Sequence, residues 1–541
     1  MKNALLILFS CFTTFSYFNL RAQTQPNLGL VYRSQEASLG YTLFTPEANN
    51  YVYLIDNCGQ VVNQWTFGEN PGATCYLLEN GNLLRAGKDT IQIKDWDDNL
   101  LWSFALNAKL GLNQHHDIEA LPNGNVLCVI ADDYPKEDLV PLGFDTISNP
   151  SSTIKLDKII ELKPWGMDSA EVVWEWKFID HLIQNFDSTK LNYGIVGDHP
   201  ELVDINFEND YINDFTHFNA IDYNANLDQI LFSVRSLHEI MIIDHSTTTA
   251  EAASHLGGNS NQGGDILWRW GNPMVYDQGS IADKKLGAQH DCKWIKEGYL
   301  DEGKITVFNN LTSNTTNFMS AIVMLNPSIA NGVYQKMNNR FLPEDYAWSW
   351  SGTLLGDTLF ENKKSGTHAL ANGNFIIAET SKGKISEIDR DGNLLWSYIN
   401  PSGQDTIFQQ DEEIIASSNR IFRAEKYPYD FEGFINKDLS QQGSIENQNS
   451  LTDSCELIIP TRIHELNAKK NIFINPSKNG LLEFIHLEQI SSLKILNLEG
   501  KTVFELHDIE TKLIGMDLNP GIYFLELSRA KLVTNHKLVV Q

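Results

Sequence analysis

Residues 383–401 read GKISEIDRDGNLLWSYINP, which describes two short strands joined by a tight turn. In GKISEI apolar and polar residues alternate, as they do in a half-buried strand. The Asp-Gly-Asn that follows supplies turn chemistry. The second strand ends in Trp396 and Tyr398, which lie two positions apart and therefore on one face. This stretch predicts a β-hairpin that buries an aromatic pair.

The same pattern recurs along the chain. Trp-x-aromatic occurs at Trp65/Phe67, Trp102/Phe104, Trp174/Trp176, Trp268/Trp270, Trp348/Trp350 and Trp396/Tyr398. The residue before the tryptophan is apolar in five of these, and the first, in VVNQWTF, departs from that. A second hairpin follows most of the tryptophan strands, as in TCYLLENGNLLRAG, so each unit carries about four strands. Six such units predict an all-β chain built as a six-bladed β-propeller, with the Trp pairs as core between blades.

The repeats are unevenly spaced. Successive first tryptophans lie 37, 72, 94, 80 and 48 residues apart, so the middle blades contain long insertions. Loops of that length usually build a binding face. The segment LGYTLF, residues 39–44, is expected to supply a strand that closes the ring.

Both ends of the chain differ from the propeller. Residues 1–22 have a lysine, a short apolar stretch and then Ala22, which predicts a secretory signal peptide. A lipoprotein signal at Cys11 is an alternative that fits the neighbouring residues poorly. We expect the propeller over 28–435, a polar linker over 436–470 and a small antiparallel β-sandwich over 471–541. No other segment is apolar enough to span a bilayer.

Charge and cysteine content exclude several function classes. The formal net charge of −28 argues against nucleic acid and anionic membranes as partners, although local cations could still hold a small anion. The cysteines after the signal show no CxxC and no Cys/His metal spacing, which indicates neither a disulfide scaffold nor a zinc site. Their odd number leaves at least one thiol free; they are Cys58, Cys75, Cys128, Cys292 and Cys455.

Histidines begin the second hairpin of several units: His116 in HHD, His217 in DFTHFN, His290 in AQHD and His368 in SGTH. The innermost strands of a propeller line its channel, so side chains at matching positions should converge. Arg235 follows His217 by 18 residues, across the hairpin. Imidazoles with a guanidinium suit a tetrahedral anion.

Other site chemistries fit less well. The carboxylate cluster of a calcium or glycosidase centre is missing, and so is the GxSxG elbow of a serine hydrolase. Three histidines could hold zinc, but a neighbouring arginine disfavours a dication. We therefore expect neither a metal nor a cofactor in this site.

Around these histidines the sequence resembles the bacterial arylsulfate sulfotransferase (arylsulfotransferase, ASST) family. The segments that carry the resemblance span about residues 90–402 and include HHDIEALPNGNVL, DFTHFNAIDYNANLDQILFSVRS, LGAQHDCKWI and SGTHALANGNFIIAETSKGKISEIDRDGNLLWSYINP. The resemblance implies a six-bladed propeller that moves a sulfuryl group from an aryl sulfate to a phenol. The implied route is ping-pong, through a transiently sulfated histidine and without a nucleotide sulfate donor.

Residue by residue, the resemblance assigns roles. His290 matches the nucleophile, His217 and Arg235 match the family's His-and-Arg hairpin, and His116, or alternatively His115, matches the early-blade histidine. His368 departs from the family pattern, so it is expected to line the channel. His115, Asn219 and His368 are the expected substrate-binding residues, whereas His199 and His238 are interpreted as structural or rim positions.

The C-terminal stretch resembles the type A sorting domain of the type IX secretion system, through NPSKNG, NLEGKTV, LNPGIYFLEL and KLVV. This implies the secretion machinery as a partner and a secreted or cell-surface location, reached via the periplasm. The other expected partners are an aryl sulfate donor and a phenolic acceptor, and a homodimer is compatible with the sequence. Two alternative functions remain: a propeller that binds sulfated or aromatic ligands without turnover, and a sulfatase-like hydrolase.

Overall fold

The structure, a computed structural model, describes residues 26–455 except 210, 212, 313–318 and 416. In the C-terminal part it describes 481–483, 492–497, 501–507, 513–515, 518, 521–529 and 532–540. The chain divides into two compact units, Met1–Ile459 and Pro460–Gln541. The expected signal peptide lies outside the described residues.

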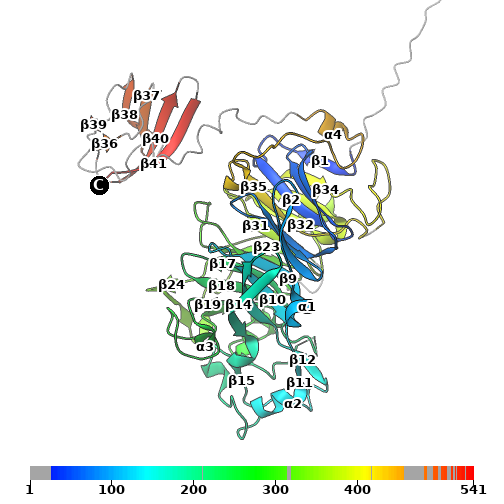
Figure 1. The fold of residues 1–541 in the computed structure, drawn as a ribbon. Coiled ribbons are helices and arrows are strands. Elements are labelled where there is room, and N and C mark those ends of the chain that lie inside the picture. The colour runs from blue at the N-terminus through cyan, green and yellow to red at the C-terminus, as the bar shows by residue number, and fades with distance from the viewer. Residues whose placement is uncertain are drawn as a thin grey trace, which may run out of the picture. The chain divides into compact units, whose positions relative to one another are not determined.

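Six antiparallel sheets form a six-bladed β-propeller, as predicted (Figure 1). The strands of each blade are given from the innermost outward. Blade 1 consists of β35 (Ile421–Pro428), β2 (Gly40–Pro46), β3 (Tyr51–Asp56) and β4 (Val61–Thr66), and blade 2 of β5 (Pro71–Leu77), β6 (Leu83–Gly87), β7 (Thr90–Lys94) and β8 (Leu100–Ala105). Blade 3 consists of β9 (Asn113–Ala120), β10 (Val126–Ala131), β13 (Lys158–Trp165) and β14 (Ser169–Lys177).

Blade 4 consists of β17 (Phe218–Asn224), β18 (Gln229–Val234), β19 (Glu239–Asp244) and β20 (Trp268–Trp270). Blade 5 consists of β21 (His290–Trp294), β22 (Ile305–Asn309), β23 (Ala321–Leu325) and β28 (Trp348–Trp350). Blade 6 consists of β31 (Gly366–Ala369), β32 (Phe375–Glu379), β33 (Lys384–Ile388) and β34 (Leu394–Ile399), with β1 (Gly29–Arg33) as a fifth, outer strand.

The repeated tryptophans join neighbouring blades, which confirms their interpretation as inter-blade core. Each blade has a tryptophan whose indole N–H donates to a backbone carbonyl of the next blade or of its connections. The six pairs are Trp65 with Asp95, Trp102 with Ser169, Trp176 with Gly264, Trp268 with Leu342, Trp348 with Arg390 and Trp396 with Asn57. Burying these rings therefore leaves no indole N–H among them without an acceptor.

Strands from opposite ends of the propeller sequence close the ring. β35 pairs antiparallel with β2, with Tyr427 opposite Tyr41 and Ala424 opposite Phe44 (Figure 1). The predicted closing strand over 39–44 is thus confirmed. It is the second strand of its blade, and β35 supplies the innermost one.

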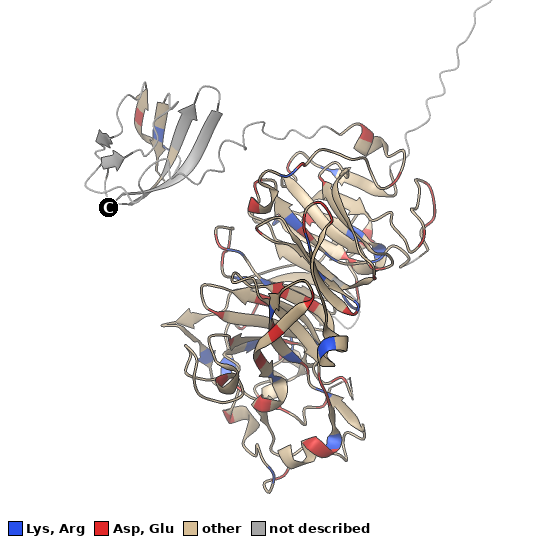
Figure 2. Cartoon of the chain, in the orientation of Figure 1, with Lys and Arg blue, Asp and Glu red and all other residues tan. Residues whose placement is uncertain are grey.

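The insertions of the middle blades contain short elements, several of which gather at the lower end of the propeller in Figure 1. The strands are β11 (Asp133–Pro135), β12 (Thr153–Lys155), β15 (Leu182–Ile183), β16 (Val203–Asp204), β24 (Ile329–Ala330), β25 (Val333–Tyr334), β26 (Lys336–Met337), β27 (Arg340–Phe341), β29 (Thr353–Leu354) and β30 (Asp357–Thr358). The helices of these insertions are α2 (Lys136–Leu139) and α3 (Thr249–Ala252), whereas α1 (Leu106–Leu110) connects blades 2 and 3 and α4 (Ser450–Asp453) follows β35. Figure 2 shows Lys and Arg interspersed with Asp and Glu along these elements.

The structure differs from the expected linker over residues 436–455, which pack on the propeller. Cys455 forms a disulfide with Cys58. Asn449 donates from its side chain to the carbonyls of Leu28 and Leu30, at 2.9 and 3.1 Å. The polar composition that suggested a linker instead supplies side-chain hydrogen bonds to backbone, as Asn and Gln readily do.

The described part of the C-terminal unit consists of strands. β37 (Ser492–Leu496), β38 (Thr502–His507), β40 (Gly521–Arg529) and β41 (Leu532–Val540) form one antiparallel sheet, and β36 (Leu481–Glu483) pairs with β39 (Leu513–Gly515). The sandwich packing of these sheets stays a prediction. Among the residues described, no helix combines the length and apolar character that crossing a membrane requires.

Candidate active site

Five of the six innermost strands, all except β31, carry a pairing irregularity near their first residues. The register of β9, β17 and β21 against their neighbours shifts there. His116 (φ 64°), His217 (φ 52°) and Asp291 (φ 52°) adopt the left-handed conformation, which is uncommon for residues other than glycine. Bulges redirect side chains, and strain of this kind gathers at functional sites. In β9, β17 and β21 the irregularities lie at or beside the predicted histidines.

His217 connects an aspartate to a second histidine. Its Nδ1 lies 2.5 Å from Asp214 Oδ2, and its Nε2 lies 3.0 Å from His116 Nε2. Burial raises the pKa of Asp214, but the hydrogen bond and charge of His217 outweigh that and lower it overall. An ionised carboxylate only accepts, so Nδ1 of His217 donates. The two Nε2 atoms therefore share one proton between the rings.

His290 is held in one tautomer. Its Nδ1 lies 2.9 Å from the carbonyl of Ala288 and 2.8 Å from Asn310 Oδ1. The Asn310 amide nitrogen donates to the carbonyls of Glu361 and Lys364, both at 2.9 Å, which fixes Oδ1 as the atom facing His290. Two acceptors at Nδ1 require the proton to be there. The lone pair therefore lies on Nε2, where it accepts from the backbone N–H of Lys364 at 3.1 Å.

Burial keeps the imidazoles of His290 and His116 neutral. The pKa of His290 is well below its ordinary value, chiefly because of burial and further because of the charges of Arg235 and Arg423, although the Asn310 bond opposes the shift. The pKa of His116 is also lowered strongly, by burial and then by the neighbouring histidines and Arg423. A neutral imidazole with a free lone pair is the form that can act as a nucleophile.

Arg423 of β35 connects three blades inside the channel. Its Nη1 lies 2.6 Å from Asp117 Oδ2, and its Nη2 donates to the carbonyl of Asn219 at 2.7 Å. Its Nε lies 3.2 Å from Asp291 Oδ1. Asp117 follows His116 and Asp291 follows His290, so one guanidinium anchors the residues next to two site histidines. Such a buried cation needs these partners, because an unpaired charge would be costly there.

Arg235 lies beside His217, as the 18-residue spacing predicted. It begins a short 3₁₀ helix, Arg235–Leu237, directly after β18, and its backbone N–H donates to the carbonyl of His217 at 3.3 Å. The guanidinium lies over the ring of Tyr211, 4.4 Å from its centroid. Stacking of this kind orients a guanidinium while leaving its N–H groups available to an anion.

Family models match the chain in two places, an arylsulfotransferase (ASST) model over residues 76–401 and a secretion system C-terminal sorting domain over 471–541. The first match spans more than half of the 541 residues. The chain belongs to the arylsulfotransferase family. It is a propeller enzyme of the arylsulfotransferase type, and the sorting domain directs it to the cell surface or outside the cell. No curated protein matches the chain.

Several solved structures are similar to this arylsulfotransferase-family chain at low identity. A protein of unknown function from Bacteroides caccae is 14% identical, covers 72% of this chain and 98% of its own, and has a TM-score of 0.38. A streptogramin B lyase is 10% identical, with coverages of 75% and 94% and a TM-score of 0.34. The virginiamycin B lyase of Staphylococcus aureus, in an inactive form with quinupristin, is 9% identical. The match covers 72% of this chain and 96% of the lyase, with a TM-score of 0.32.

Within the arylsulfotransferase fold, His116 rather than His115 hydrogen-bonds to His217. His115 points to Asp157, with Nε2 3.1 Å from Oδ1. Asp157 in turn accepts from the backbone N–H of Phe218 at 2.6 Å. The ring of His115 is partly exposed, 5.0 Å from that of His116. Of the two adjacent histidines, His116 therefore belongs to the proton-sharing pair and His115 flanks it.

Two expected substrate-binding residues, Asn219 and His368, have contacts with neighbouring blades. Asn219 is fully buried and donates to the carbonyl of Gln289 at 2.8 Å, which links blades 4 and 5. His368 of β31 faces β35, where its Nε2 accepts from the backbone N–H of Lys426 at 3.3 Å and its Nδ1 lies 3.8 Å from Glu425 Oε2. Burial lowers the pKa of His368 to about 4. The structure gives both residues protein partners.

The remaining two histidines fit their interpretation as structural or rim positions. His238 is buried, and its Nδ1 accepts from the backbone N–H of Ala288 at 2.9 Å. His199 is about half exposed and pairs with Glu201 at 2.9 Å.

The orienting residues of the site were missed at the sequence level. Asp214 lies three residues before His217, a separation that does not distinguish it from other loop aspartates. Asn310 and Tyr211 lie on insertions whose path only the fold reveals. The HHD and QHD motifs did contain a signal, since each histidine is followed by an aspartate. Those paired aspartates could have predicted a buried cation between them, which Arg423 supplies.

Proposed function

We propose that this chain transfers a sulfuryl group from an aryl sulfate to a phenol, by a ping-pong route through a sulfated His290 and without a nucleotide donor. The observation that carries the proposal is the fixed tautomer of His290. Its proton is committed to Ala288 and Asn310, and its lone pair lies on Nε2. A neutral, oriented imidazole that feels the charge of the Arg235 guanidinium suits attack on an anionic sulfate ester.

In the first step, the Nε2 lone pair forms a bond to sulfur while the bond between sulfur and the aryl oxygen breaks. The phenolate leaves, and His290 becomes an N-sulfoimidazolium. The ring now carries positive charge, so its Nδ1–H donates more strongly to Ala288 and Asn310. In the second step a phenol oxygen attacks the sulfur, the N–S bond breaks and neutral His290 is restored.

The backbone N–H of Lys364 has a defined part in this proposal. It donates to Nε2 of His290 at 3.1 Å, where the sulfuryl group must be bound. When sulfur occupies that position, the N–H can donate to a sulfuryl oxygen instead, as an oxyanion donor does. Lys364 and Ser365 both have left-handed φ, 58° and 72°. This strained turn therefore presents the N–H toward the reacting atom.

Arg235 and the histidine pair complete the chemistry. Arg235, held over Tyr211, offers N–H donors to the sulfuryl oxygens. The proton between His116 and His217 passes to the departing phenolate and returns from the incoming phenol. Asp214 keeps His217 oriented throughout this exchange.

The test is to mix the protein with 4-nitrophenyl sulfate without an acceptor, quench at alkaline pH and measure intact and peptide masses. We expect one SO₃ group on the peptide that carries His290, and its discharge when a phenol is added. Multiple turnovers by His290→Gln, or an adduct on His116 or His217, would overturn the assignment. Phenol-independent turnover would instead support a hydrolase, and binding without phenol release would support a binding module.

A further inference from the structure

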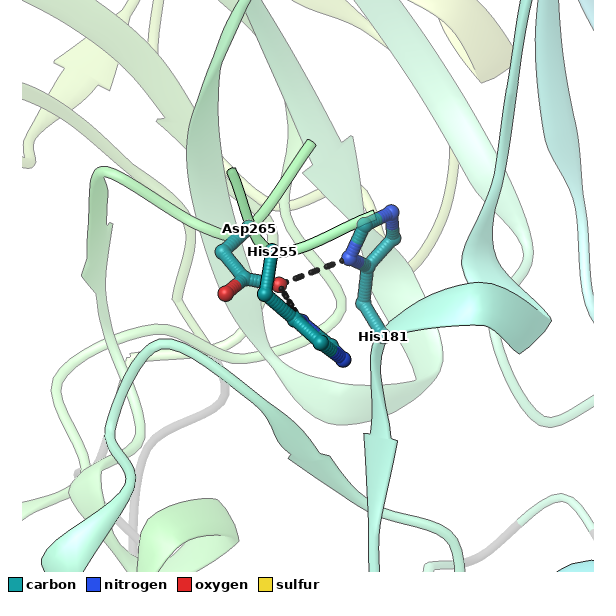
Figure 3. Close-up of side chains that lie close together, drawn as sticks. All are labelled: His181, His255 and Asp265. Carbon is teal, nitrogen blue, oxygen red and sulfur yellow. Dashed lines mark hydrogen bonds and ion pairs between the residues drawn. The ribbon is translucent and has the colours of Figure 1, made fainter. Parts of the chain in front are cut away.

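A second cluster of chemistry-bearing side chains lies at the outer edge of blades 3 and 4, apart from the channel. His181 ends a short 3₁₀ helix, Phe178–His181, that directly follows the outermost strand β14. His255 and Asp265 lie on the connection from β19 to β20. Figure 3 shows both imidazoles directed at one carboxylate oxygen. The three candidate ligand atoms all lie within 4.8 Å of one another.

The hydrogen bonds of His181 create an acceptor mismatch. Its Nε2 lies 2.9 Å from the carbonyl of Ala252, which can only accept, so Nε2 carries a proton. In the neutral ring Nδ1 is then a bare lone pair, and it lies 2.9 Å from Asp265 Oδ1. Two acceptors at this distance repel each other. A proton, carried by the ring or by the carboxyl group, or a metal ion must therefore lie between them.

We propose that the histidine–aspartate cluster of His181, His255 and Asp265 binds a divalent transition-metal ion, with zinc as the best fit. Two imidazoles and a carboxylate are ligands that zinc accepts in four-coordinate sites. The carbonyl of Ala252 holds the far nitrogen of His181, as second partners of metal-binding histidines usually do. Trp176 stacks on the ring of His181, with centroids 5.1 Å apart and planes 4° apart, so its rotation is limited.

The two distances from the imidazoles to Asp265 need only a small adjustment to take the ion. Metal–ligand bonds of roughly 2.0–2.1 Å place the ligand atoms of a tetrahedral site about 3.3 Å apart. Nδ1 of His181 and of His255 lie 2.9 and 2.8 Å from Asp265 Oδ1, so the group must open by about half an ångström. His181 and Asp265 are buried, whereas the side chain of His255 is 60% exposed and can move. Its open side leaves the fourth position to water.

The ion would fasten the β19–β20 connection of blade 4 to the edge of blade 3. That contact is already close, because Trp176 donates to the carbonyl of Gly264 at 2.7 Å. A Cβ at Gly264 would lie 2.0 Å from the carbonyl oxygen of Ala252 and 2.8 Å from Nε2 of His181. Glycine therefore lets the backbone approach the back of the cluster. The proposed role is structural, and it is independent of sulfuryl transfer.

The experiment uses the untagged full-length chain, stripped with a chelator and dialysed. We expect one tightly bound Zn²⁺ per chain by calorimetry and metal analysis, and a thermal midpoint raised by a few degrees when zinc is added. Co²⁺ in the same site should show the visible bands of a four-coordinate ion. His255→Gln and Asp265→Asn should each weaken zinc binding by about 100-fold or more.

The matched control is His199→Gln, which removes another exposed histidine that pairs with a carboxylate, at 2.9 Å from Glu201. It should bind zinc like the unchanged chain. Because His255 is exposed, its variant should fold, and circular dichroism checks that it does. A folded unchanged chain that binds no zinc would leave a protonated His181–Asp265 ion pair and overturn the proposal. Zinc binding that survives both cluster variants would overturn it too.

Discussion

At the scale of single residues, the channel depends on histidines that stay neutral because they are buried. His116, His290, His238 and His368 all have a pKa below the ordinary histidine range, with burial as the first cause. A neutral imidazole can act as a nucleophile, but burying it in that form reduces the stability of the fold at low pH. In acid these histidines take up protons in the unfolded chain but not in the folded chain. The free energy of unfolding therefore decreases as the pH is lowered.

The loss of stability at low pH can be measured at His368. Its pKa is about 4 in the folded chain and roughly 6.5 when unfolded, so stability should be lost as pH falls from about 6.5 to about 4. The shift corresponds to ~3 kcal/mol. We expect urea unfolding of His368→Gln to show a smaller loss of stability between neutral pH and pH 4 than the unchanged chain. His199→Gln is the control. Equal losses in all three chains would mean that His368 titrates normally.

Arg235 should contribute to the reaction and little to folding. Its guanidinium stacks on Tyr211 at 4.4 Å and lies at the site rather than between blades. Removing one donor to developing charge typically costs about 100-fold in rate. We expect Arg235→Ala to lose about that much turnover of 4-nitrophenyl sulfate, with an almost unchanged thermal midpoint. Arg340→Ala, which breaks an exposed ion pair with Asp283, is the control. A folded variant with normal turnover would remove Arg235 from the site.

The site was predictable from sequence only where a repeat marked it. His116, His217 and His290 recur at the start of matching hairpins, so ring geometry alone brings them together. No repeated pattern marks the other residues of the site, because they lie on loops whose path depends on tertiary packing. They are Asp214, Asn310 and Tyr211. Asn219 donates to the carbonyl of Gln289 and so links two blades, while its expected contact with substrate stays a prediction.

At the scale of elements, the strands were predictable because each hairpin contains its own turn signal and tryptophan. The segment 436–455 was not, because its order depends on a distant partner. Gln442 N donates to Val61 O at 2.8 Å, and Asn449 caps α4 with its side chain. A polar composition does not distinguish a flexible linker from a segment whose side chains hydrogen-bond to the backbone of the propeller.

The disulfide between Cys58 and Cys455 should therefore hold one element rather than the whole ring. β35 already joins β2 through backbone hydrogen bonds, so the covalent link mainly secures the segment 436–455. We expect Cys455→Ser to change the thermal midpoint modestly and to make this segment much more sensitive to protease. Cys128→Ser, which alters a buried free thiol, is the comparison. Cooperative unfolding of the whole propeller upon reduction would contradict this.

At the scale of the whole molecule, two units have separate tasks. The propeller contains every residue of the candidate site, and the C-terminal unit matches a sorting domain. A chain that ends at residue 459 should fold with the same thermal midpoint and keep its turnover, because no site residue is lost. In cells it should accumulate in the periplasm rather than at the surface, which fractionation with activity staining can measure. Export of the shortened chain, or its misfolding, would refute this division.

Closure of the ring by β35 also fixes when the site can exist during synthesis. Arg423, which anchors the aspartates beside two site histidines, lies on the last strand of the propeller to leave the ribosome. A nascent chain that has already made five blades holds His116, His217 and His290 but lacks the guanidinium that joins their neighbours. Sulfuryl transfer should thus begin only after β35 has been made and has closed the ring, whether or not the C-terminal unit follows.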